Sequence, residues 1–76
     1  MTRNEQALYA EMQNMGYSHG LCLTALKILS ASPQAVSDML AFLYDEQPSE
    51  EMFIAEIARI CEVNEIEFNK ILINTT

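Results

Sequence analysis

The order of hydrophobic and polar residues along this chain follows the period of an α-helix. In the first segment Leu8, Met12 and Met15 recur four and three residues apart, which places them on one face of a helix. No segment alternates apolar and polar residues as a half-buried strand does, and only two glycines and two prolines interrupt the chain. The pattern therefore predicts an all-α fold.

Helix-capping side chains divide the chain into a single bundle of about five predicted short helices. Ser, Thr or Asn before a helix accepts a hydrogen bond from a free backbone N–H group, and a Glu three residues later completes a capping box. We expect the first helix to end at Asn14 or Met15. The predicted capping residues are, in chain order, Thr2 with Glu5, Ser18, Ser32 with Pro33, Ser49, and Asn64 with Glu67.

The predicted helices differ in how much of their surface is apolar. From Leu21 to Leu29 only Thr24 and Lys27 are polar, so we expect this helix to be buried at the centre of the fold. Each later helix carries one apolar stripe that we expect to face inward. These stripes are Val36, Met39, Leu40 and Leu43; Phe53, Ile54, Ile57, Ile60 and Cys61; and Phe68, Ile71 and Leu72.

Length and charge narrow the class of protein. With 76 residues, of which 50% are hydrophobic, the chain builds one domain over residues 1–76 around one modest core. The formal net charge is -7, and all of it comes from residues 38–76, because acids and bases balance in residues 1–37. The acidic half would repel phosphate backbones, so we expect no nucleic-acid partner. Its charge is either a solvated surface or a patch for a basic partner.

The sequence offers little for catalysis or for metal binding. The only histidine, His19, falls in an exposed first turn, and Glu50 and Glu51 diverge by about 100° on a helix. Calcium-loop and phosphate-loop motifs are missing, so we expect a non-enzymatic protein without cofactor or metal. Cys22 and Cys61 have no C-x-x-C spacing and are expected to be small buried core residues, with a disulfide only in a secreted protein.

The first residues are polar, and no apolar run approaches the roughly 18 residues of a membrane span. We therefore expect no signal peptide, no contact with a membrane and a cytoplasmic location.

The tripeptide Met15-Gly16-Tyr17 is the most distinctive motif. A glycine after an amphipathic helix suits the position where the backbone turns left-handed, and Tyr17 would then fold back on the last turn. The two apolar side chains around Gly16 are consistent with either of two roles. They cap and pack the first helix, or they form a binding loop.

Residues 4–44 resemble a ubiquitin-associated (UBA-like) three-helix domain. The resemblance consists of Met15-Gly16-Tyr17, Ala25-Leu26 in the second helix, and a third helix that ends at Leu43. It implies a UBA-like part over residues 1–44, followed by an acidic two-helix extension over residues 49–76. It further implies that a partner protein binds a shallow apolar surface. The contact residues that it implies are Met15, Gly16, Tyr17 and Leu43.

Residues 54–72 resemble a helix-turn-helix unit, with Glu62 where glycine is usual in the turn. The residues that would face a DNA groove include Glu65 and Glu67 and no base. Acidic side chains at these positions would repel DNA phosphates, so we expect a helix-turn-helix shape that does not bind DNA.

Two main hypotheses about function follow. The first is a protein-protein interaction module that binds a peptide segment or a ubiquitin-like surface through the Met-Gly-Tyr loop and the end of the third helix, aided by Phe42 and Tyr44. The second is a homodimeric structural or regulatory protein, because the chain has more large apolar residues than a small core hides. A third possibility is an acidic surface that occupies a basic groove of a partner.

Overall fold

A computed structural model describes residues 1–67, and these form four α-helices. They are α1 (Arg3–Asn14), α2 (His19–Leu29), α3 (Pro33–Glu46) and α4 (Glu50–Val63). The all-α prediction is confirmed for this part of the chain. The fifth predicted helix, with Phe68, Ile71 and Leu72, lies outside the described residues.

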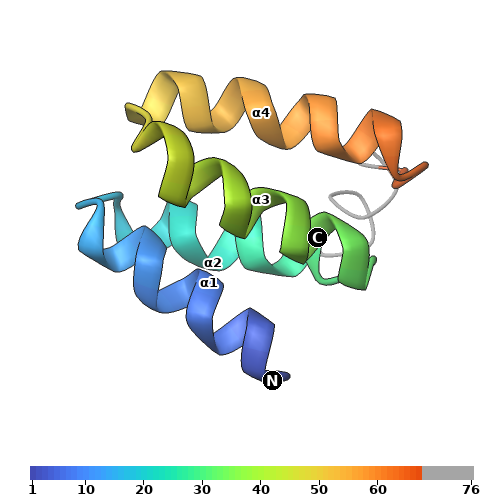
Figure 1. Cartoon of the computed structure of the whole chain (residues 1–76), viewed down its shortest axis with the longest axis horizontal. Helices are drawn as coiled ribbons and strands as arrows, with labels where there is room; N and C mark the ends of the chain where they lie inside the picture. The colour runs from blue at the N-terminus through green and yellow to red at the C-terminus, as the bar shows by residue number, and fades with distance from the viewer. Residues whose placement is uncertain (68–76) are drawn as a thin grey trace.

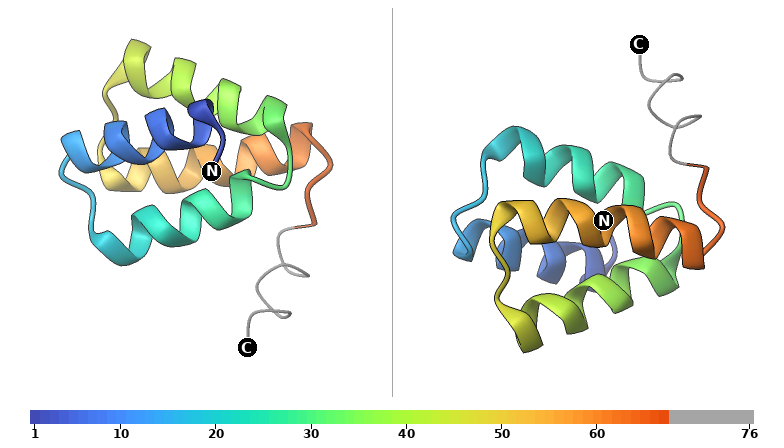
Figure 2. Two further views of the ribbon diagram at one scale, coloured as in Figure 1. Left: turned by 90° about the horizontal axis from the view of Figure 1, so that it is seen from below. Right: turned by 90° about the horizontal axis from the view of Figure 1, so that it is seen from above.

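The helices are stacked so that α2 and α3 lie between α1 and α4 (Figure 1). Seen from below, α1 lies over the line where α2 and α3 meet, and seen from above, α4 lies over the same line from the other side (Figure 2). Each outer helix therefore packs against both middle helices.

Side-chain caps at the four helix starts match the predictions. At α1, the Thr2 hydroxyl accepts the Glu5 N–H at 3.1 Å, and the Glu5 carboxylate accepts the Thr2 N–H at 2.7 Å, which completes the capping box. The hydroxyl groups of Ser18, Ser32 and Ser49 accept N–H groups in the same way at α2, α3 and α4. Each such cap stabilises its helix by about 1 kcal/mol.

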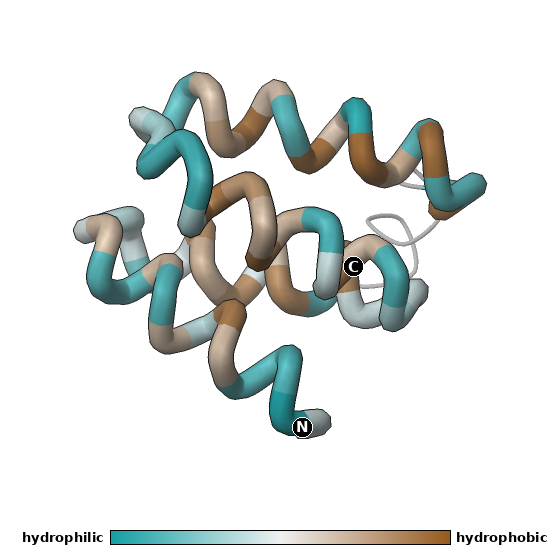
Figure 3. The backbone as a smooth tube through the Cα atoms, in the orientation of Figure 1, coloured by the Kyte–Doolittle hydropathy of each residue, from teal (hydrophilic) through white to brown (hydrophobic). Residues whose placement is uncertain are grey.

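The core lies between the layers and takes side chains from all four helices. Its fully buried members include Leu8, Met39 and Phe53. Along α4, hydrophobic residues recur between hydrophilic ones (Figure 3). Two expectations about burial were wrong: Ile54 is 51% exposed, and α2 is not buried all round, because Leu23 is 48% exposed.

The Met-Gly-Tyr turn ends α1 as predicted. Gly16 takes a left-handed φ of +82°, and no atom lies within 4 Å of where its Cβ would be. The Gly16 N–H donates to the carbonyl of Gln13 at 3.0 Å, and the Tyr17 N–H donates to that of Met12 at 3.3 Å. These paired bonds are the Schellman ending of a helix.

The end of α4 repeats this geometry without a glycine. Glu65 takes a φ of 56°, its N–H donates to the Glu62 carbonyl at 3.3 Å, and the Ile66 N–H donates to the Cys61 carbonyl at 2.8 Å. Asn64 is therefore the last cap of α4, whereas the sequence pattern placed it at the start of a helix. The helix-turn-helix resemblance is also out of register here, because Glu62 lies inside α4 and the chain turns only at Glu65.

The two endings predict opposite effects of substitution on stability. Gly16→Ala should lower the free energy of unfolding by about 1 kcal/mol, because a Cβ disfavours the left-handed backbone even where space is open. Glu65→Gly should raise it by up to about 1 kcal/mol for the same reason. Urea unfolding followed by circular dichroism measures both. Gly20→Ala, inside α2, is the control, and it should not destabilise the protein.

Candidate functional site

Tyr17 connects the Met-Gly-Tyr turn to α4. Its hydroxyl donates to the carbonyl of Pro48 at 2.6 Å, and its ring stacks on Phe53 with centroids 4.6 Å apart and planes at 26°. The side chain is only 7% exposed. Burial, together with the negative charge of Glu50, raises the pKa of Tyr17 above its ordinary value of 10.0. The phenol therefore stays a protonated hydrogen-bond donor at neutral pH.

A second contact joins the starts of α2 and α4. The Ser18 N–H, at the cap of α2, donates to the carboxylate of Glu50 at 3.1 Å. Glu50 is the first residue of α4. The two helices run side by side in the same direction, and this hydrogen bond joins them at their starts (Figure 2, right).

The structure places the four expected contact residues in different surroundings. Tyr17 and Leu43 lie in the core, Met15 is half-buried against it, and Gly16 is exposed. The Met-Gly-Tyr turn does act as a helix cap. The shallow apolar surface implied by the UBA-like resemblance is not open, because Phe53 of α4 stacks on Tyr17 and Leu43 is fully buried in the core. Of the two suggested neighbours, Phe42 is half-buried, and Tyr44 is exposed.

An apolar groove opens elsewhere, between α2 and α4. Its volume is about 250 Å³, and Thr24 is the only polar residue among the described residues that line it. Ile54, the half-exposed member of the α4 stripe, lies in its wall. We call it the α2–α4 groove, and it is lined by Leu21, Thr24, Ala25 and Ile28 from α2 and by Ile54, Ile57 and Ala58 from α4.

Sequence reasoning missed this groove, although a signal was present. The apolar character of α2 predicts complete burial, and the spacing along α4 predicts that Ile54 faces inward, but both helices expose apolar residues. A helix with apolar residues beyond those facing the core also presents some of them outward. Such an excess on both α2 and α4 indicates an exposed apolar surface where the two helices meet.

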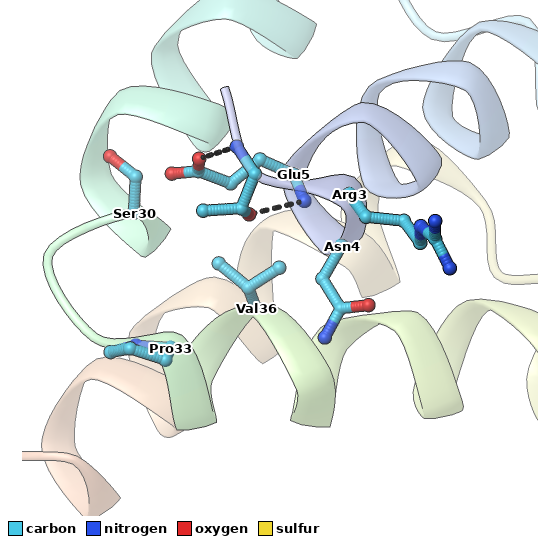
Figure 4. Close-up of a pocket in the computed structure, with 7 residues that line it drawn as sticks. Arg3, Asn4, Glu5, Ser30, Pro33 and Val36 are labelled. Atoms are coloured by element: carbon cyan, nitrogen blue, oxygen red, sulfur yellow. Dashed lines mark hydrogen bonds between the residues drawn. The ribbon is translucent and has the colours of Figure 1, made fainter.

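A second hollow lies at the start of α1, between that helix and the α2–α3 connection (Figure 4). Its volume is about 370 Å³, and Thr2, Arg3 and Glu5 line it together with residues around Pro33. The capping box already pairs Thr2 with Glu5, and the hydrogen bond from the Thr2 N–H lowers the pKa of the Glu5 carboxyl. The Glu5 carboxylate at the start of α1 disfavours an anion in this hollow.

The side chains capable of chemistry do not converge. Cys22 and Cys61 are free and buried, as expected, and burial raises the pKa of both thiols. His19 is exposed in the first turn of α2, with its Nδ1 3.3 Å from the Tyr9 hydroxyl. Among residues 1–67, no group of three or more His, Cys, Asp or Glu side chains is placed to hold a metal ion.

Comparison of the chain with protein-family models, with curated proteins and with solved structures gave no match. No helix in residues 1–67 is long and apolar enough to cross a membrane. Residues 1–67 form a small all-α bundle with an apolar groove on its surface.

Tyr17→Phe tests the link between the turn and α4. The variant keeps the ring on Phe53 but leaves the Pro48 carbonyl without its donor, so the free energy of unfolding should fall by about 1 kcal/mol. Urea unfolding gives the value. Tyr9→Phe, which removes a hydroxyl from a more exposed position, is the matched control and should cost less. Equal effects of the two substitutions would show that the Pro48 contact does not hold α4.

The raised pKa of Tyr17 predicts a loss of stability at high pH. A group whose folded pKa lies above its unfolded pKa contributes stability that is complete below the unfolded value, here 10.0, and is lost as pH rises through the folded value. The stability difference between the native chain and Tyr17→Phe should therefore be constant up to about pH 9 and shrink above pH 10. Parallel urea titrations across this range measure the difference, and the other ionisable groups cancel in it.

Proposed function

We propose that this protein is a non-catalytic protein-binding module and that the α2–α4 groove receives its partner. One observation carries the proposal: a surface hollow between two adjacent helices has Ala25, Ile28 and Ile57 of the core as its buried floor. Among the described residues that line it, only Thr24 is polar. Exposed apolar residues are common on proteins when scattered singly, whereas here they gather around one concave surface shared by two helices.

The shape of the groove favours an amphipathic helix as the partner. Its walls are two helices, and the lining residues recur at the three- and four-residue spacing of a helix face, as in Leu21, Ala25 and Ile28. A volume of about 250 Å³ is below the roughly 300–1,000 Å³ of sites for drug-sized molecules. An amphipathic helix can place apolar side chains three and four residues apart into such a groove.

Charge indicates which helices would bind best. Ile54 and Ala58 form part of the α4 wall of the groove. The three- and four-residue spacing of the helix places one acidic residue beyond each end of this wall, Glu51 before it and Glu62 after it. The chain as a whole carries a formal net charge of -7. Complementary charge speeds encounter and excludes partners of like charge. The expected partner is therefore a helix with an apolar stripe and basic residues beside it.

Within this proposal the Met-Gly-Tyr turn supports the binding site and does not contact the partner. A partner could reach Tyr17 and Leu43 only after α4 left the core, and α4 contributes Phe53, Ile57 and Ile60 to that core. The turn instead holds the start of α4 beside α2, which forms one end of the groove.

The test uses a designed Leu/Lys helical peptide of about 18 residues, with Leu at i, i+3, i+4 and i+7. Ile54→Glu should weaken its binding at least about tenfold, because a carboxylate would be buried in the apolar groove. Met52→Glu is the matched control, because Met52 is 52% exposed on α4 and does not line the groove. Isothermal titration calorimetry gives the dissociation constants.

Both variants add one negative charge, so a purely electrostatic attraction of the peptide would leave them equal, and that result would contradict the proposal. Sedimentation of the native chain tests the homodimer alternative. Self-association that is abolished by Ile54→Glu and retained in Met52→Glu would assign the groove to a second copy of this chain.

A further inference from the structure

The last described residues lead toward the α2–α4 groove. After α4 ends, the chain reverses at Glu65, and both views in Figure 2 show residues 64–67 passing from the end of α4 toward the end of α2. Ile66 packs against the core, and its N–H donates a hydrogen bond to the Cys61 carbonyl, which holds Ile66 to the last turn of α4. Ile28, near the end of α2, lines the groove. The described chain therefore ends on the same side of the bundle as the end of α2, where Ile28 lines the groove.

The sequence that follows has the pattern that the groove fits. Phe68, Ile71 and Leu72 recur at i, i+3 and i+4, the spacing of one apolar face of a short helix. Lys70 is the only charged residue among residues 68–76, while all eleven acids of the chain precede it. This segment thus combines an apolar stripe with a positive charge, which are the two properties that favour binding to this groove.

We propose that residues 68–76 dock Phe68, Ile71 and Leu72 into the α2–α4 groove of their own chain. The dimensions agree: nine helical residues span about 13 Å, and the α2 wall from Leu21 to Ile28 spans about 10 Å. This inference rests on the proposed function for the nature of the site and adds its regulation. An external helix has to displace residues 68–76, which lowers its apparent affinity by the fraction of time that the groove is free.

The experiment uses the full chain with 13C-labelled isoleucine methyl groups. Ile71→Asp should shift the methyl resonances of Ile28, Ile54 and Ile57, because a charged side chain would leave an apolar groove. The methyl of Ile60, which is buried and does not line the groove, should stay in place. Asn69→Asp adds the same charge outside the apolar stripe and should move none of the four. Groove methyls that are unmoved in Ile71→Asp would overturn the inference.

A second measurement separates this inference from the proposed function. The Leu/Lys peptide is titrated into the native chain, Ile71→Asp and Asn69→Asp. If residues 68–76 fill the groove about nine-tenths of the time, Ile71→Asp should bind the peptide about tenfold more tightly than the other two. Shifted groove methyls without peptide binding in any variant would uphold the docking and reject the proposed function. Equal peptide binding in all three, with groove methyls unmoved, would reject the docking alone.

Discussion

The arrangement of this protein depends on the contact of Tyr17 with Pro48 and Phe53. A buried hydroxyl without a partner costs about 1–3 kcal/mol, so the Tyr17 hydrogen bond fixes where the α3–α4 connection passes. The stacked Phe53 then sets the rotation of α4 about its axis, because one face of the helix has to meet the Tyr17 ring. From that rotation it follows which α4 residues enter the core and which remain beside α2. The groove is therefore a consequence of the same contact that completes the core.

Local chemistry made the helices predictable from the sequence. The caps at Thr2, Ser18, Ser32 and Ser49 bind backbone groups only three residues away, so their pattern is visible without knowledge of the fold. Gly16 was predictable for the same reason. Asn64 was not, because a residue with a side-chain amide can start one helix or end another, and the left-handed conformation that decided the outcome belongs to Glu65.

Non-local packing was not predictable, and the candidate site depends on it. Tyr17 and Pro48 lie 31 residues apart, and nothing near either residue indicates that they meet. The resemblance of residues 4–44 to a three-helix domain predicts an open surface at Tyr17 and Leu43. In the structure Phe53 of the fourth helix stacks on Tyr17, and Leu43 is fully buried. The stacking of Tyr17 on Phe53 also leaves Ile54 at the surface, because only about half of the circumference of α4 can face the core.

The energetics of the groove favour an occupant that can leave. Burial of Phe68, Ile71 and Leu72 would contribute about 5–9 kcal/mol at about 1.5–3 kcal/mol for each side chain. Ordering the backbone of the five residues from Phe68 to Leu72 costs about 5–10 kcal/mol at about 1–2 kcal/mol each. The near balance means that docking within the chain would be partial and reversible. A longer partner helix adds apolar contacts at each end, and its basic residues would meet Glu51 and Glu62, so it can displace residues 68–76 without any change in the four-helix core.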